Sequence, residues 1–129
     1  MIKREAKFGR TFNHWMRANP LNLPAFAFEL KQTRTDSIHF MAVAPHQILF
    51  LQSAKSPHGM YYKIPDDSRG IKPFDGVFLR NTPGYLVFKY KDFFCLIDVD
   101  VFVKESMESD RRSLTSARAK EIAAYTIDV

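Results

Sequence analysis

Apolar residues recur along the first part of the chain with the spacing of an α-helix. On a helical wheel of about 100° per residue, one arc of residues 3–18 carries four large apolar side chains, Phe8, Phe12, Trp15 and Met16. The pattern ends at Asn19-Pro20, because proline disfavours helical backbone in the residue before it. We therefore predict an amphipathic helix over residues 3–18.

In the stretch AFAFELKQT, large apolar residues occupy every second position instead of following helical spacing. Side chains of a strand point to the two faces of a sheet in turn. One face of a strand over residues 25–32 would then carry Phe26, Phe28 and Leu30. The other face would carry Glu29 and Lys31, two charges beside an apolar layer. This pair is either an ion pair on a half-exposed strand or part of a functional site.

Shorter apolar runs separated by turn residues fill the rest of the chain. Pro45 opens a second predicted helix, because proline suits the first helical turn, and we expect its buried side to be Ile48, Leu49 and Leu51. Further strands are predicted at about 60–64, 76–81, 85–90 and 93–103. A solvated loop, ESMESDRRS, follows, and Ser113 or Thr115 caps a last helix through Tyr125. This order predicts one α/β domain over residues 1–129, with a mixed sheet flanked by helices.

Composition narrows the class of protein. With 46% hydrophobic residues, twelve of them Phe, the chain is unlike a disordered one. The single cysteine, Cys95, excludes an internal disulfide and a four-cysteine zinc site, and a reducing cytoplasm is the expected location. No stretch approaches the roughly 18 apolar residues of a membrane span, so we expect no membrane partner.

The formal net charge of +5 favours a polyanionic partner, most commonly nucleic acid. The polar arc of the first predicted helix is cationic and consists of Lys3, Lys7, Arg10, His14 and Arg17. Such a stripe suits backbone phosphates, which give salt-dependent binding without sequence readout. The alternative is a solvated helix face. Several later cations would extend the surface, namely Arg34, Lys55, Lys63, Arg69 and Lys72.

Residues 25–52 also resemble a known family of enzymes. A strand ending in Glu29-x-Lys31-x-Thr33 is followed by a polar loop with Ser37 and Phe40, and then by His46-Gln47-Ile48 opening a helix. This layout resembles the core of Holliday junction resolvases in the restriction-endonuclease-like, PD-(D/E)xK nuclease superfamily, the bacterial ones above all. Residues 84–105 loosely resemble their closing strand pair. The resemblance implies a restriction-endonuclease-like fold and a metal-dependent endonuclease that cleaves branched DNA, in a nucleoid or in the cytoplasm of a phage-infected cell.

The resemblance also implies roles for individual residues. Glu29 would bind Mg²⁺, for which Mn²⁺ could substitute, because hard cations take carboxylate oxygens. Lys31 would orient the attacking water or stabilise developing negative charge. Glu5 would be the first-helix carboxylate directed to the metal, and it lies in the apolar arc, where a charge needs a partner. Gln47 would stand near the site, or it is simply a polar residue that opens a helix.

The aspartate of this family is missing from its usual place. The segment before the Glu-x-Lys strand, PLNLPAFAF, contains no acid. Asp75, in KPFDGVFL, enters a later strand, so we predict a rearranged, permuted Asp-bearing hairpin and a metal site of Glu5, Glu29 and Asp75. Alternatively, Asp75 caps a turn. Asp98 and Asp100 would share one face of the strand at 93–103, as a rival metal pair or a solvated edge.

Symmetric cutting of two strands implies a homodimer, with an interface supplied by strands 85–90 and 93–103 or by the first helix. Two alternatives stay open. One is a non-catalytic DNA-binding protein that kept the nuclease fold. The other is a nuclease of the same fold that acts on another DNA or RNA structure.

Overall fold

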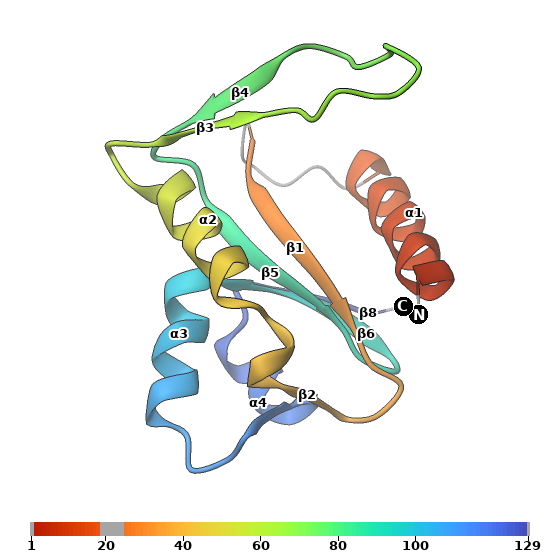
Figure 1. The fold of residues 1–129 in the computed structure, drawn as a ribbon. Coiled ribbons are helices and arrows are strands. Elements are labelled where there is room, and N and C mark those ends of the chain that lie inside the picture. Colours follow the sequence, from red (N-terminus) through yellow and green to blue (C-terminus); the bar gives the residue numbers. More distant parts are fainter. Residues whose placement is uncertain (1, 19–24, 129) are drawn as a thin grey trace.

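A mixed sheet organises the chain (Figure 1). Its strands are β1 (Ala27–Gln32), β5 (Gly84–Lys89), β6 (Phe93–Asp98) and β8 (Tyr125–Asp128), in the order β1-β5-β6-β8. β1 is parallel to β5, whereas β5 with β6 and β6 with β8 are antiparallel. This computed structural model describes residues 2–18 and 25–128, with side chains from Lys7 onward.

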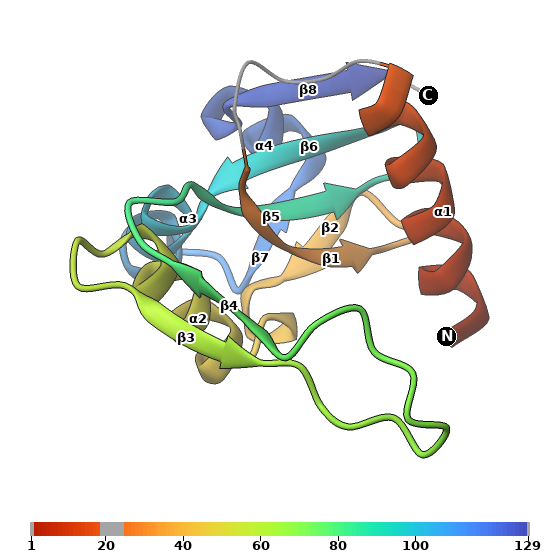
Figure 2. The same ribbon diagram turned by 90° about the horizontal axis from the view of Figure 1, so that it is seen from above.

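Helices cover both faces of the sheet (Figures 1 and 2). α1 (Ile2–Ala18) lies on one face, and α2 (Pro45–Lys55), α3 (Val99–Glu108) and α4 (Ser116–Ile122) lie on the other. The predicted mixed α/β architecture is therefore confirmed. Across the described part of the chain, no helix has the length and apolar character to cross a membrane.

The face under α1 is packed with aromatic side chains. Phe8 and Phe12 of α1 are buried against Tyr85, Val87, Phe94 and Leu96 of the sheet. Trp15 and Met16 are partly buried on the same cluster. Phe8, Phe12 and Trp15 each contact the Phe94 ring, at centroid distances of 5.5–6.0 Å. The helical period of the sequence thus predicted both α1 and its buried arc.

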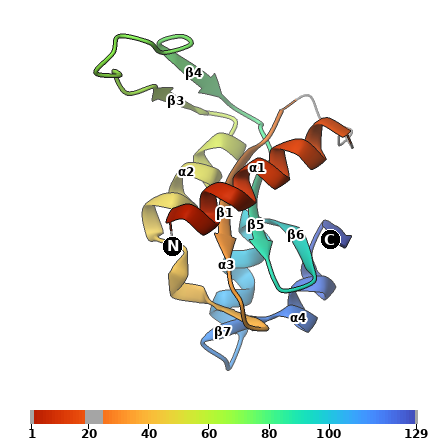
Figure 3. The same ribbon diagram turned by 90° about the vertical axis from the view of Figure 1, so that its right-hand side faces the viewer.

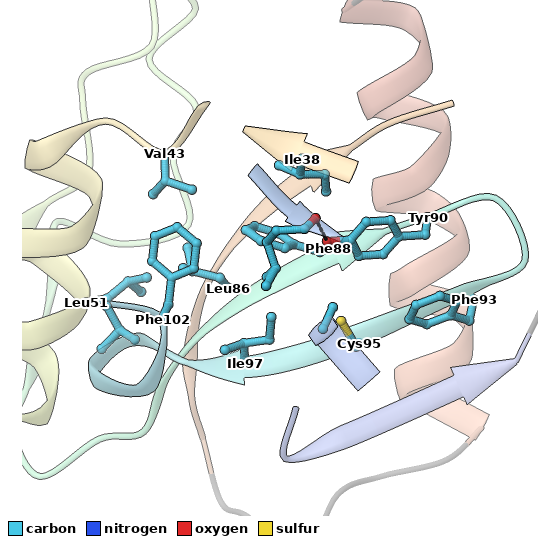
Figure 4. Close-up of a cluster of buried hydrophobic side chains, with 13 residues drawn as sticks. Ile38, Val43, Leu51, Leu86, Phe88, Tyr90, Phe93, Cys95, Ile97 and Phe102 are labelled. Carbon is cyan, nitrogen blue, oxygen red and sulfur yellow. Dashed lines mark hydrogen bonds between the residues drawn. The ribbon is translucent and has the colours of Figure 1, made fainter. Parts of the chain in front are cut away.

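The opposite face carries the larger core, drawn in Figure 4. Leu86 and Phe88 of β5 alternate with the residues that face α1, as the pleat requires. α2 packs closely on the start of β5, and the glycine at position 84 allows this approach. A Cβ there would lie only 2.8 Å from the carbonyl oxygen of Leu51. The buried hydroxyl of Tyr90 donates to the carbonyl of Leu114, 2.9 Å away. This bond ties the end of β5 to β7 (Ser113–Thr115), which pairs with β2 (Ser37–His39).

β1 lies at one edge of the sheet, since it pairs with β5 alone. Phe26 and Leu30 pack on the α1 side and Ala27 on the α2 side, so the predicted alternation is confirmed. α1 crosses the strands, and its N-terminal end lies beyond the free edge of β1 (Figures 2 and 3). Glu29 and Lys31 therefore lie on an edge strand, on the face that α2 covers.

A hairpin of β3 (Met60–Lys63) and β4 (Gly76–Leu79) projects from the body of the protein (Figure 3). The loop between the two strands extends away from the sheet (Figure 2). Large apolar side chains remain exposed on this hairpin and its loop, namely Tyr61, Tyr62, Ile71, Phe74 and Phe78.

The predicted strand at 93–103 is wrong in its second half. β6 ends at Asp98, and α3 begins at Val99 and includes the ESME of the predicted loop. The Asp98 side chain accepts hydrogen bonds from the backbone N–H groups of Asp100 and Val101, which caps the helix. Asp98 and Asp100 are therefore a helix cap and a first-turn residue rather than alternating strand residues.

Three smaller predictions are also corrected. Leu49 is 64% exposed, whereas the buried side of α2 is formed by Leu51 and Ala54. Thr115 caps α4 as predicted, but the helix ends at Ile122 and the chain continues into β8. β5 and β6 are interior strands with buried side chains on both faces, so they cannot form the proposed dimer interface.

Candidate functional site

A groove with a volume of about 430 Å³ lies between β1, α2 and the β3–β4 hairpin. Its walls are largely apolar and come from all three elements, with Phe28, Phe50, Leu51, Met60, Tyr62 and Val77 among them. Phe50 and Tyr62 meet edge to face, with ring centroids 6.3 Å apart, and both remain about half exposed. Glu29, His46 and Gln47 are the polar side chains of this groove.

Glu29 and Lys31 form an ion pair beside the groove. Lys31 Nζ lies 3.5 Å from Glu29 Oε2, and the two side chains are 20% and 31% exposed, respectively. The i, i+2 spacing on a strand places both on one face. A half-exposed carboxylate with an adjacent ammonium can bind a hard cation and stabilise a developing negative charge.

The two polar residues that open α2 also face this groove. Gln47 Oε1 accepts a hydrogen bond from the Ala44 backbone N–H at 2.9 Å, so the helix-opening role considered for Gln47 is present. Gln47 can contribute to the groove only through its Nε2 donors. His46 packs edge to face on Phe50, with ring centroids 6.4 Å apart, and its imidazole is exposed.

The structure does not bring Asp75 to the groove lining. Asp75 precedes β4, its side chain is 89% exposed, and its carboxylate lies 3.4 Å from Lys72 Nζ. Lys72 makes a shorter ion pair, of 2.6 Å, with Asp66. Among the described residues, no three His, Cys, Asp or Glu side chains gather closely enough to hold a metal ion. The side chains of Lys3 and Glu5 lie outside the described residues.

A second charged cluster joins α2 to the start of α3. Lys55 Nζ lies 2.7 Å from Asp98 Oδ1 and 2.6 Å from Asp100 Oδ2, and Gln52 donates to Asp100. The hydrogen bond from Lys55 lowers the pKa of Asp100. Burial alone would lower the pKa of Lys55, but its bonds with Asp100 and Asp98 outweigh burial and raise it. Sequence reasoning missed this cluster, although Asp98 before an apolar i, i+3 pair is a helix-start signal.

The predicted basic surface divides into free and paired cations. Exposed side chains follow one another along α1, at Lys7, Arg10, His14 and Arg17, and Arg34 is exposed after β1. By contrast, Lys55, Arg69 and Lys72 are engaged by nearby aspartates. Lys63, at the end of β3, is exposed and forms no ion pair with a described residue. The predicted cations that remain available therefore lie on α1, just after β1 and at Lys63.

No protein-family model, no curated protein and no solved structure matches this chain.

Proposed function

We propose that this chain is a metal-dependent endonuclease with a permuted restriction-endonuclease-like fold, which cleaves branched DNA in the manner of a Holliday junction resolvase. The observation that carries the proposal is the Glu29–Lys31 pair, which lies on the exposed edge strand β1 and borders an open groove. Gln47, on the helix that follows β1, lines the same groove. This juxtaposition supports the resemblance seen in the sequence.

In this proposal Mg²⁺ would bind at the groove through a ligand set that the substrate completes. Mg²⁺ is commonly held by one or two carboxylates together with substrate phosphates and water, and Glu29 supplies one carboxylate at the groove. Glu5 would supply the second, from the end of α1 that lies beyond the free edge of β1 (Figure 3). Asp75 would have to leave Lys72 to take part.

The chemistry divides between the ion and the protein. A bound divalent cation polarises a phosphodiester and lowers the pKa of an attacking water. Glu29 would hold its position through the register of β1 with β5. Lys31, 3.5 Å from that carboxylate, would orient the nucleophile and stabilise the negative charge that develops on the phosphate oxygens.

DNA and a second copy of the chain are the partners in this proposal. The cationic side chains of α1 would bind backbone phosphates and favour DNA shape over sequence. Two symmetric cuts require two sites related by a two-fold axis. Because β5 and β6 are interior, the first helix remains of the two predicted interfaces. The β3–β4 hairpin and its loop offer a second surface, where Tyr61, Phe74 and Phe78 are 53–61% exposed.

A second candidate function is DNA binding without cleavage. It is favoured by the engagement of Asp75 with Lys72 and by the absence of a three-ligand group among the described residues. In that case the Glu29–Lys31 pair would only stabilise an edge strand.

The test is cleavage of a four-way junction, a duplex and a single strand by the wild-type protein and the variants Lys31→Ala and Glu29→Gln, with Mg²⁺, Mn²⁺ or EDTA. We expect that the wild-type protein cleaves the junction only when the cation is present. The rate of cleavage should fall by at least about a hundred-fold in each variant. Junction binding should change little. Lys104→Ala, an exposed lysine on α3, is the matched control and should cut normally.

Two outcomes decide between the candidates. Tight junction binding with no cleavage under either cation would establish the non-catalytic alternative. Unchanged cleavage by Lys31→Ala would remove the role assigned to that lysine.

A further inference from the structure

A separate pocket of about 320 Å³ opens on the α1 side of the sheet, beyond the end of β1. It is lined by Lys7, Phe8, Thr11, Gln32, Arg34 and Lys89. Gln32 follows Phe26 and Leu30 on the face of β1 toward α1, opposite to the face of Glu29 and Lys31. The pocket is therefore distinct from the groove described above.

Three cations and no acid line this pocket. They come from three segments, because Lys7 lies on α1, Lys89 ends β5, and Arg34 follows β1. Neither Lys7 nor Arg34 forms an ion pair with a described residue, whereas Lys55, Arg69 and Lys72 are all paired with aspartates. Asp92 lies outside the lining, and its charge acts on Lys89. Like charges repel, so the two unpaired cations that converge beside Lys89 favour binding of an anion.

Lys89 is built into the pocket rather than merely exposed near it. Gln32 and Lys89 are register partners in the parallel β1–β5 pair, so their side chains share a face. The Lys89 ammonium donates to the carbonyls of Tyr90 and Lys91, which fixes its position. Partial burial lowers the pKa of Lys89 against the opposing charge of Asp92, and a further anion beside it would favour the charged ammonium.

Gln32 supplies a second, independent observation. Its Oε1 is a buried side-chain oxygen that has no hydrogen-bond partner among the described residues. Buried polar atoms in proteins are normally paired. The carboxamide of Gln32 also carries two N–H donors, and the residue lines the pocket. A ligand with several oxygens would accept hydrogen bonds from these donors.

We propose that this pocket binds a phosphate group. Arg34 would offer a fork of donors, Lys7 and Lys89 would offer point charges, and the Gln32 amide would offer neutral donors. A backbone phosphodiester of DNA and a free phosphate ester share this chemistry. The site does not depend on cleavage at Glu29, and in a nuclease it would hold a phosphate away from the bond that is cut.

The test is an NMR titration of the labelled protein with inorganic phosphate, and separately with the dinucleotide TpT, at constant ionic strength. We expect a saturable shift of the Gln32 side-chain amide signals. Arg34→Ala and Lys89→Met should each weaken binding by about tenfold or more. Lys104→Ala should bind like the wild type. Tighter binding of TpT would identify a phosphodiester as the source, and tighter binding of inorganic phosphate a monoester.

Gln32→Glu keeps the shape of the side chain and places a negative charge in the pocket. This variant should stay folded, by its amide spectrum, and lose phosphate binding. The proposal is overturned if neither probe shifts the Gln32 amide saturably, or if Gln32→Glu or Arg34→Ala binds as well as the wild type. The titration does not depend on cleavage. If the protein binds phosphate in the titration but cuts no DNA in the cleavage assay, the nuclease proposal is refuted and the phosphate site is not.

Discussion

At the scale of single residues, most of the protein interior is aromatic or aliphatic, and Tyr90 is a polar exception. Its ring is 1% exposed and stacks on Phe93, with centroids 5.1 Å apart. Burial raises the pKa of the phenol, so the hydroxyl stays neutral and donates to Leu114. One hydrogen bond thus joins the sheet to β7, which packs outside it.

We predict that Tyr90→Phe lowers the free energy of unfolding by about 1–2 kcal/mol, because the buried Leu114 carbonyl loses its donor. Urea denaturation followed by circular dichroism measures the change. Tyr61→Phe is the matched control, since Tyr61 is 58% exposed, and it should change stability by less than about 0.5 kcal/mol. Equal effects of the two substitutions would mean that the Tyr90 hydrogen bond contributes little.

At the scale of secondary-structure elements, α2 and the start of α3 are joined by Lys55 and its two aspartates. Lys55 is the last residue of α2, Asp98 caps α3, and Asp100 lies in its first turn. The negative charges also suit the N-terminus of a helix. This cluster fixes where β6 ends and therefore which way the chain leaves the sheet.

We predict that Asp100→Asn destabilises the protein at pH 7 by up to about 1 kcal/mol, since the side chain is 55% exposed and solvent weakens the pair. The pKa of Asp100 is below its ordinary value of 3.8 in the folded state. The unfolded chain therefore binds more protons in the window below about pH 4, and the contribution of Asp100 is lost as the pH falls through its folded pKa.

The measurement is the difference in unfolding free energy between wild type and Asp100→Asn, from pH 7 down to pH 2.5. The difference should shrink on acidification. Glu108→Gln, an exposed carboxylate at the other end of α3, should show a smaller difference throughout. A pH-independent gap between wild type and Asp100→Asn would contradict the assigned role.

At the scale of the whole molecule, only some of the cations behind the net charge of +5 are free of ion pairs with aspartates. The aspartates of the hairpin loop and of α3 pair with neighbouring cations. The exposed cations of α1 remain on the side of the sheet opposite α3. A polyanion can therefore bind along α1, although Lys104, Arg111 and Arg112 are exposed on and after α3 and Glu29 and Lys31 lie on the face of β1 that α2 covers.

We predict that replacing Lys7, Arg10 and Arg17 together by Gln weakens binding to a four-way junction. The slope of log K against log salt should become shallower by up to about 3, because each phosphate contact contributes close to one unit. Fluorescence anisotropy across a salt series measures the slope. The control carries the same loss of charge at Lys104, Arg111 and Arg112, on and after α3. Equal slopes in the two variants would mean that the cations of α1 face solvent and do not contact the phosphates of the junction.

Several elements were predictable because their periods are local. The apolar arc of α1 and the alternation of β1 follow from side-chain geometry alone, and the sequence placed Glu29 and Lys31 correctly on one strand face. The segment at 93–103 was ambiguous, because an alternating apolar and acidic run fits a strand as well as a capped helix. The bond between Asp98 and Lys55, distant in sequence, accompanies the change to a helix.

The amino-acid sequence by itself determined the class of fold, the amphipathic α1 and the charged pair on β1, because each depends on the spacing of neighbouring residues. Only the tertiary structure decided that Asp75 lies outside the groove that Glu29 lines, and that β5 and β6 are interior strands. It alone gathered Lys7, Gln32, Arg34 and Lys89 around one pocket. Contacts between segments distant in the chain depend on packing and strand order, and no local period encodes these.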